Sequence, residues 1–334
     1  MTRAAVLGAG AWGTTFAAVL ADAGSQVRLW GRDTDVVAAI NTQRRNDRFL
    51  PGVPVHDAVT ATTDPHEALA DAELVVVALP SQQVRQIVAP WRDAVPADAT
   101  VVSLMKGIEM GTHARMSQVL AEVWGVEQER LAVVSGPNLA REIAVRQPTA
   151  TVVAATHVEA AERVAAATAS AYFRPYTNPD VLGVELCGAY KNVIAVSVGI
   201  ADGLGFGHNT TATVITRGLA EITRLGLALG AQAETFSGLA GMGDLIATCA
   251  SPLSRNHTLG HHIGTGASLA EAIDRTGGTA EGVKTSLSIL ELAHSAGVDV
   301  PICAAVVAML HQGEPKEAVL EALLSRPRKA EVQL

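Results

Sequence analysis

Near its N-terminus the chain reads Gly8-Ala9-Gly10-Ala11-Trp12-Gly13, a G-x-G-x-x-G pattern placed between a predicted strand and a predicted helix. Residues 3–7 have the composition of a short buried strand, and the Ala-rich residues 14–20 have that of a helix. In this context Gly8 permits a tight turn, Gly10 lets the backbone approach a pyrophosphate, and Gly13 lets the helix pack closely on the strand. The helix N-terminus offers free N–H groups to phosphate oxygens. The stretch therefore predicts a dinucleotide-binding unit, with a ligand-free glycine loop as the alternative.

The composition is that of a folded protein that does not bind nucleic acid. The 334 residues are 49% hydrophobic and 17% charged, which excludes a disordered chain, and the net charge of −8 disfavours a nucleic-acid partner. The three cysteines form no C-x-x-C pair, and the histidines lack metal-binding spacing, so we expect buried thiols in a reducing cytoplasm and no metal. The longest apolar runs, such as 192–201 and 300–310, are too short to span a bilayer, so no membrane insertion is expected.

The first half of the chain alternates predicted strands and helices. After the glycine turn, the predicted strands are 27–30, 74–79, 100–104, 131–134 and 149–154, and the predicted helices include 36–40 and 159–171. The run 74–79 is continuously apolar, as is typical of a parallel strand buried on both faces. This alternation predicts an α/β fold with a Rossmann-type, doubly wound parallel sheet.

After about Asp180 the pattern changes to helices separated by glycine and proline. The predicted helices are 211–229, 280–295, 301–312 and 315–325, followed by a polar tail at 326–334. We therefore predict two domains, a dinucleotide-binding domain over residues 1–182 and a mostly helical substrate and catalytic domain over residues 183–334.

The end of the second predicted strand bears on the choice of cofactor. In NAD-binding folds an acidic residue about 20 residues beyond the glycines holds the ribose 2′-hydroxyl. Here the strand ends in Trp30-Gly31-Arg32-Asp33, with no carboxylate at the strand tip itself. The guanidinium of Arg32 suits a 2′-phosphate, although a solvated surface charge is the alternative. Asp33 keeps NAD(H) possible. We expect use of both cofactors, with NADP(H) preferred.

Two polar positions in apolar surroundings are candidates for proton transfer. Lys191 is the one charged residue between Glu185 and Asp202, and burying a lone lysine is costly unless it has a purpose, although a lysine reaching the surface is the alternative. Asp244 follows a glycine-rich segment and could cap a helix beginning at Leu245, or hold the lysine.

Other polar groups are expected at the ligand-binding edge of the sheet. The run Ser254-Arg255-Asn256 places a hydroxyl, a guanidinium and an amide side by side, as an anion site needs, although a polar turn would look similar. Lys106 and the segment Ser135-Gly136-Pro137-Asn138 each follow a predicted strand, at the carboxyl edge where such folds bind ligands.

Taken in order, these segments resemble the bacterial NAD(P)-dependent glycerol-3-phosphate dehydrogenases over residues 1 to about 325. The resemblance rests on Gly8–Gly13, Lys106-Gly107, Ser135-Gly136-Pro137, Glu185–Asn192, Gly238–Cys249, Ser254-Arg255-Asn256 and Glu281-Gly282. It implies interconversion of sn-glycerol 3-phosphate and dihydroxyacetone phosphate with NAD(P)+ and NAD(P)H, and a supply of glycerol 3-phosphate for phospholipid synthesis.

The resemblance also implies roles for single residues. Lys191 matches the family's proton donor and acceptor, with Lys106 beside it and Asp244 orienting it. The substrate positions match Lys106, Gly136, Asn138, Lys191, Asp244, Ser254, Arg255 and Asn256. Beyond the glycines, the nucleotide positions match Ala11, Trp12, Arg32, Lys106, Ala140, Arg255, Thr279 and Glu281. The chain departs from the family at Ala11, often serine, and at Asn138, usually serine or threonine.

In the implied mechanism Lys191 exchanges a proton with the C2 oxygen of the triose while Arg255, Ser254 and Asn256 hold its phosphate. Neighbouring cations would lower the pKa of Lys191, and burial must offset the opposite effect of Asp244. The alternatives are a related two-domain dehydrogenase of a hydroxy or keto acid, such as ketopantoate reductase or hydroxyisobutyrate dehydrogenase, and a non-catalytic NADP-sensing protein. The apolar second domain predicts a homodimer.

Overall fold

The N-terminal half is an eight-stranded sheet flanked by helices. The structure is a computed structural model that describes residues 1–278 and 280–325. The strands are β1 (Arg3–Leu7), β2 (Gln26–Trp30), β3 (Val59–Thr62), β4 (Leu74–Val77), β5 (Thr100–Ser103), β6 (Leu131–Ser135), β7 (Thr149–Ala154) and β8 (Phe173–Asn178). The α-helices are α1 (Ala11–Asp22), α2 (Thr34–Gln43), α3 (Pro65–Leu69), α4 (Val84–Val88), α5 (Met116–Trp124), α6 (Ala140–Ala144) and α7 (Val158–Thr168), with short 3-10 turns at Ala89–Ala94 and Gln128–Arg130.

Both faces of the sheet are covered, as the continuous apolar strands predict. The strand order is β3-β2-β1-β4-β5-β6-β7-β8. Successive strands are added on one side of β1 up to β3 and on its other side from β4 onward, so the strand order reverses between β1 and β4. One core joins the sheet to α1, α2, α6 and α7, and a second core joins its other face to α3, α4 and α5. In folds of this kind the ligand lies outside the carboxyl ends of the strands at such a reversal, which here is the position of the glycine turn after β1. The predicted doubly wound fold is confirmed.

One pair of strands departs from the predicted parallel arrangement. β6 and β7 are antiparallel, with Val134 opposite Val153, whereas β1 to β6 run parallel. The connection between β6 and β7 contains the short helix α6, and the carbonyl of Ala140 in that helix accepts a hydrogen bond from Thr15 of α1. The connection therefore returns at the same edge of the sheet instead of crossing over it.

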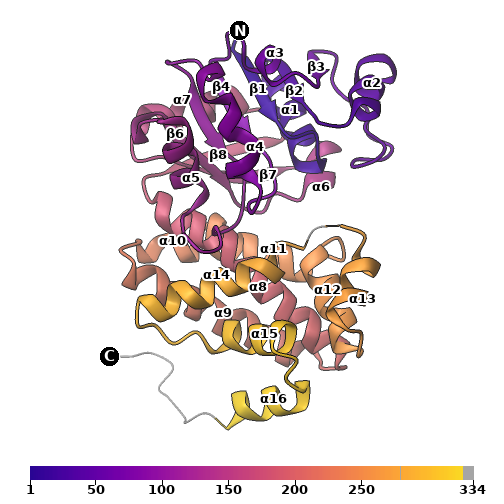
Figure 1. Cartoon of the computed structure of the whole chain (residues 1–334), viewed down its shortest axis with the longest axis vertical. Helices are drawn as coiled ribbons and strands as arrows, with labels where there is room; N and C mark the ends of the chain where they lie inside the picture. The colour runs from indigo at the N-terminus through magenta and orange to yellow at the C-terminus, as the bar shows by residue number, and fades with distance from the viewer. Residues whose placement is uncertain (279, 326–334) are drawn as a thin grey trace.

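The C-terminal half is helical and is built around one long helix (Figure 1). Its helices are α8 (Val181–Gly203), α9 (His208–Ala228), α10 (Ala233–Ser237), α11 (Asp244–Ala250), α12 (Arg255–Gly264), α13 (Leu269–Thr276), α14 (Gly282–Ser295), α15 (Pro301–His311) and α16 (Lys316–Leu324), with a π-helical turn at Leu239–Gly243. α8 is long and apolar enough to cross a membrane, but 83% of its most apolar window is buried inside the protein, as in a core helix.

The helix α8 touches α12 through glycines. A Cβ at Gly199 would lie 2.0 Å from the carbonyl oxygen of His257, and one at Gly260 would lie 2.1 Å from that of Val196. The two backbones are therefore in direct contact, which larger side chains would prevent. This close crossing fixes the start of α12, where the predicted anion site lies, against the helix that carries Lys191.

Two strands were not predicted from the sequence, and several predicted helix ends differ by a few residues from those in the structure. β3 and β8 lie at the two edges of the sheet and have exposed or half-buried residues, so they lack the apolar runs of the inner strands. A domain boundary between residues 182 and 183 would fall within the first turn of α8 and stays a prediction. The predicted tail at 326–334 and Thr279 lie outside the described residues.

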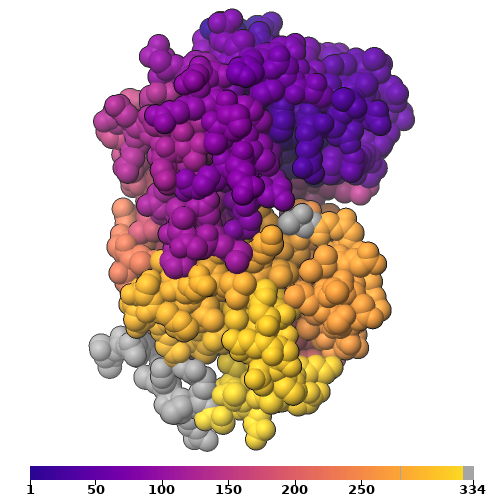
Figure 2. All heavy atoms as spheres, viewed as in Figure 1, coloured from indigo at the N-terminus to yellow at the C-terminus, as the bar shows by residue number. Residues whose placement is uncertain are grey.

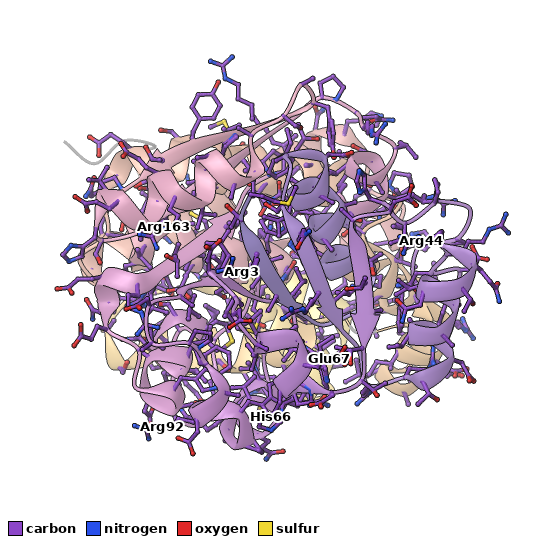
Figure 3. All side chains as sticks on the ribbon, turned by 90° about the horizontal axis from the view of Figure 1, so that it is seen from above. Arg3, Arg44, His66, Glu67, Arg92 and Arg163 are labelled. Atoms are coloured by element: carbon purple, nitrogen blue, oxygen red, sulfur yellow. The ribbon has the colours of Figure 1, made fainter. Side chains whose placement is uncertain are left out.

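The N- and C-terminal halves stack along the long axis of the molecule and meet along a band across its middle (Figure 2). The end farthest from the helical half carries the start of β1 and residues such as Arg3 (Figures 1 and 3). The carboxyl ends of the parallel strands point the other way, towards the band where the two halves meet.

We expect Gly199→Ala to destabilise the protein by about 1–3 kcal/mol, the usual range for overpacking a core. The added methyl group would meet backbone atoms, which cannot rotate away as a side chain can. Gly207→Ala is the matched control, because no described atom lies within 4 Å of a Cβ at Gly207. Urea unfolding of both variants measures the difference, and equal stabilities would contradict the close crossing.

Candidate active site

The glycine turn has the geometry that a pyrophosphate needs. Gly8 has a φ of 126°, and a Cβ there would lie 2.3 Å from the carbonyl oxygen of Ala78 at the end of β4. A Cβ at Gly13 would lie 1.9 Å from the carbonyl oxygen of Gly8, so both positions require glycine. No described atom lies within 4 Å of a Cβ at Gly10, so that side of the turn is open for a ligand. No described side chain caps α1, which leaves N–H groups of its first turn for phosphate oxygens.

The neighbouring side chains also fit a nucleotide. The indole Nε1 of Trp12 is buried and has no hydrogen-bond partner among the described residues. A buried donor of this kind is costly unless a ligand or water accepts its proton. Ala11 begins α1 and brings no hydroxyl to the phosphates.

The end of β2 presents a positive charge to solvent. Arg32 is exposed, as either the 2′-phosphate hypothesis or the surface-charge alternative allows. Asp33, which keeps NAD possible, accepts hydrogen bonds from the backbone N–H groups of Asp35 and Val36 and so caps α2. The side chain of Asp33 therefore stabilises the start of α2, whether or not it also binds a cofactor.

Lys106 reaches from the carboxyl edge of the sheet into the boundary between the halves. It follows β5 by three residues, and its Nζ donates to the carbonyl oxygen of Gly136, 3.1 Å away, just past β6. The same Nζ lies 2.6 Å from Oδ2 of Asp244, at the start of α11. Residues after two neighbouring strands thus meet a residue of the helical half.

Lys191 approaches the same carboxylate from the other side. It lies on α8 with 7% of its surface exposed, pairs with Oδ1 of Asp244, and donates to Oγ1 of Thr248 at 2.7 Å. Asp244 is itself only 1% exposed. One buried carboxylate therefore joins two ammonium groups, one from each half of the molecule. Of the two alternatives for Asp244, capping a helix that begins at Leu245 is wrong, because Asp244 is itself the first residue of α11. The other alternative is what the structure shows, since its oxygens pair with the lysines.

Burial lowers the pKa of Lys191 to about 8, from 10.5. The Asp244 carboxylate raises this pKa, and the Lys106 ammonium lowers it. Desolvation is the largest of these effects, because an ammonium group loses its hydration shell when it is buried. An amine with a pKa near 8 is suited to both give and take a proton at neutral pH.

The predicted anion site lies at the N-terminus of α12, which spans ten residues. Oγ of Ser254 accepts a hydrogen bond from the N–H of His257 at 3.3 Å and so caps the helix. Arg255 is exposed and leaves its guanidinium available to a ligand. Asn256 is engaged within the protein: its Nδ2 donates to Asn192 on α8 and its Oδ1 accepts from the N–H of Gly282, both at 3.0 Å.

Glu281 connects the helical half to the sheet half. Its carboxylate lies 3.4 Å from the backbone N of Ser81, beyond β4. Burial raises its pKa, while the hydrogen bonds of Ser81 and the charges of Arg255 and Lys106 lower it. Glu281 is therefore within electrostatic reach of both cations. Farther along the edge, Nδ2 of Asn138 donates to Oγ1 of Thr151 at 2.9 Å.

Sequence reasoning missed a second link between the halves. Glu185 of α8 accepts from Nη1 of Arg115 at 2.5 Å, from the N–H of Ser117 at 2.8 Å and from its Oγ at 2.6 Å. These contacts hold the start of α5 on α8, two turns before Lys191. Thr248 was also missed, although its spacing of four residues from Asp244 places the two on one helix face.

Metal ligands do not gather anywhere in residues 1–278 and 280–325, where no group of three or more His, Cys, Asp or Glu residues could hold an ion. Cys187, Cys249 and Cys303 are free and buried. Burial raises the pKa of the Cys249 thiol to about 12, so it stays protonated at neutral pH.

Comparison with known proteins gives one consistent result across the whole chain. The models for the N-terminus and the C-terminus of NAD-dependent glycerol-3-phosphate dehydrogenase match residues 3–161 and 180–321. A glycerol-3-phosphate dehydrogenase [NAD(P)+] of Thermobifida fusca is 55% identical over 332 residues, covering 99% of each chain. The one of Streptomyces griseus is 54% identical over 329 residues, covering 98% of each. A crystal structure of glycerol-3-phosphate dehydrogenase from Coxiella burnetii superimposes with a TM-score of 0.92 at 34% identity, covering 97% of this chain and 99% of that one.

The lowered pKa of Lys191 predicts a pH-dependent stability. Below pH 8 Lys191 is charged in both states, so the folded state carries the full cost of the buried ammonium. Between pH 8 and 10.5 only the unfolded state keeps the proton, and the cost disappears. We expect the free energy of unfolding of the wild type, relative to Lys191→Met, to rise by on the order of 3 kcal/mol over this window.

Urea unfolding at intervals from pH 7 to 10.5 measures this difference. Lys284→Met, at an exposed lysine of α14, controls for the loss of one charge and a long side chain. A wild-type to Lys191→Met difference that stays flat, or falls, would show that Lys191 keeps its proton in the buried site.

Proposed function

The chain belongs to the NAD-dependent glycerol-3-phosphate dehydrogenase family, and from this we propose which of its residues carry out the reaction. It interconverts sn-glycerol 3-phosphate and dihydroxyacetone phosphate with NAD(P)+ and NAD(P)H. The match of both halves favours this phosphorylated triose over the hydroxy or keto acid of the alternative hypothesis. A non-catalytic sensor would not need the buried Lys106–Asp244–Lys191 cluster.

That cluster is the observation that carries the proposal. When bound, a nicotinamide cofactor would supply or accept the hydride. Lys191 donates its proton to the C2 oxygen of dihydroxyacetone phosphate, and accepts it from the hydroxyl in the reverse direction. Its pKa of about 8 lets it act in both directions. Asp244 holds Lys191 in place, and Lys106 supplies a second positive charge that stabilises negative charge on the same oxygen.

The substrate phosphate is proposed to bind at the start of α12. Arg255 offers a planar guanidinium, which suits phosphate oxygens, and the helix N-terminus adds its positive dipole end. Ser254 can still donate its hydroxyl proton while it caps the helix. Asn256 ties α12 to α8 and α14 and would position Arg255. Gly136 and Asn138, which we also propose to contact the substrate, lie beyond β6, where the carbonyl of Gly136 accepts a hydrogen bond from Lys106.

The cofactor is proposed to lie across the reversal point of the sheet. Its pyrophosphate would meet the glycine turn, and Trp12 would donate its unpaired indole proton. The proposed nucleotide residues are Gly8, Gly10, Ala11, Trp12, Gly13, Arg32, Lys106, Ala140, Arg255 and Glu281, with Thr279 outside the described residues.

We also propose the cellular location and the oligomeric state of the enzyme. Three buried free thiols suit a reducing cytoplasm. The apolar composition of the helical half suits a homodimer, which light scattering would test. The product glycerol 3-phosphate is a precursor of phospholipids.

Lys191→Met should lower kcat by at least about 100-fold, the scale on which a general acid or base acts, and leave nucleotide binding in place. In the wild type, kcat/KM for ketone reduction should fall as the pH rises through about 8, because reduction needs the protonated amine. The pH profiles of both directions, measured with Lys284→Met as control, check this. Turnover at the wild-type rate by Lys191→Met would exclude Lys191 as the acid.

Arg255→Leu should raise KM for dihydroxyacetone phosphate and lower kcat, because a charged hydrogen bond worth roughly 1.5–3 kcal/mol is lost and C2 is positioned less well. Some cofactor affinity should be lost too. The informative measurement is the preference for dihydroxyacetone phosphate over unphosphorylated dihydroxyacetone. If this ratio is unchanged, the phosphate binds elsewhere, and Lys106 is the next candidate.

A further inference from the structure

Both carboxylate oxygens of Asp33 already have partners within the protein. Oδ1 accepts hydrogen bonds from the backbone N–H groups of Asp35 at 3.0 Å and Val36 at 3.2 Å. Oδ2 forms an ion pair with the guanidinium of Arg48. At this place beyond β2, NAD-specific folds use a free carboxylate to hold the ribose 2′-hydroxyl, and that carboxylate repels a 2′-phosphate. Here its charge is matched by a cation.

The segment that carries Arg48 is fixed in place, although 63% of the Arg48 side chain itself is exposed. Two residues before it, Nδ2 of the buried Asn46 donates to the carbonyl oxygen of Ala9 at 2.9 Å and to Oγ1 of Thr14 at 2.7 Å. The segment after α2 is therefore fastened to the glycine turn itself. The guanidinium of Arg48 also lies over the ring of Phe49, 5.4 Å from its centre, which limits the directions the side chain can take.

The local balance of charge favours an anion. Arg32 is exposed and directly precedes Asp33 in the chain, and Arg48 pairs with Asp33, so this short stretch beyond β2 has two arginines for one carboxylate. With Arg48 in place this group of three side chains is positive. Without it, Asp33 would regain a free oxygen for a 2′-hydroxyl and would repel a 2′-phosphate.

We propose that Arg48 is a cofactor-specificity-determining residue, which masks the Asp33 carboxylate and thereby favours NADPH over NADH. The inference rests on the proposed position of the nucleotide at the glycine turn. It assigns to Arg48 an action through Asp33, and leaves direct contact with the 2′-phosphate to Arg32.

A double-mutant cycle tests this action. The variants are Arg48→Ala, Asp33→Asn and the two combined, and the readout is the Kd of NADPH and of NADH from fluorescence titration. Asparagine caps a helix as well as aspartate does, so Asp33→Asn keeps α2 while removing the negative charge. We expect Arg48→Ala to shift the ratio of the two Kd values towards NADH by about tenfold, and to shift it by less than about threefold in the Asp33→Asn background.

Two results would overturn the proposal. One is an unchanged Kd ratio in Arg48→Ala. The other is an equal shift in both backgrounds, which would mean that Arg48 contacts the 2′-phosphate directly. Arg3→Ala is the matched control, because it removes the same charge from an exposed ion pair, with Glu73, at the far end of the sheet (Figure 3). It should leave the ratio unchanged.

The cofactor test stands apart from the proposed reaction. Kd values report on the nucleotide site even if the substrate is different, whereas reduction of dihydroxyacetone phosphate by the wild type at saturating cofactor reports on the proposed function. Thermal unfolding of each variant shows whether it is folded. A folded Arg48→Ala protein that oxidises NADH with improved kcat/KM would agree with the binding result.

Discussion

The site depends on one buried carboxylate that two ammonium groups share. Asp244 pairs with Lys106, which extends from the edge of the sheet, and with Lys191, which extends from the central helix of the other half. Removing Asp244 would leave two ammonium groups close together without a counter-ion in a desolvated place, whereas removing one lysine would leave the other paired. The arrangement therefore constrains the whole molecule, because the edge of the sheet, α8 and the start of α11 must all stay in register for the three charges to meet.

Small residues make that register possible. A Cβ at Gly188 would lie 3.0 Å from Oγ of Ser135 and 3.4 Å from Cγ of Lys106, so α8 passes directly over the lysine side chain. On the same helix, Glu185 binds the start of α5, and Asn192 binds Asn256. One face of α8 thus contacts the sheet half, the cluster of charges and α12 in succession. The position of α8 therefore fixes where the sheet half, the charged cluster and α12 lie relative to one another.

The sequence predicted the parts that depend on local pattern. The glycine turn, the inner apolar strands and the lone Lys191 each carry a signal within a few residues. The edge strands β3 and β8 do not, because their exposed faces are polar. The antiparallel turn from β6 to β7 and the role of Asp244 depend on partners far along the chain. A carboxylate at the first turn of a helix suits capping and ion pairing equally well, and only the fold distinguishes them.

The apolar composition of α8 affects how the chain folds while it is being synthesised. This helix packs against α9, α11, α12, α14 and α15, all of which follow it in the sequence. During synthesis from the N-terminus, α8 leaves the ribosome before any of these covers it. For that interval the nascent chain exposes a helix that is as long and as apolar as a membrane-spanning segment. Whether it aggregates then depends on how soon the remaining helices, or a chaperone, cover it.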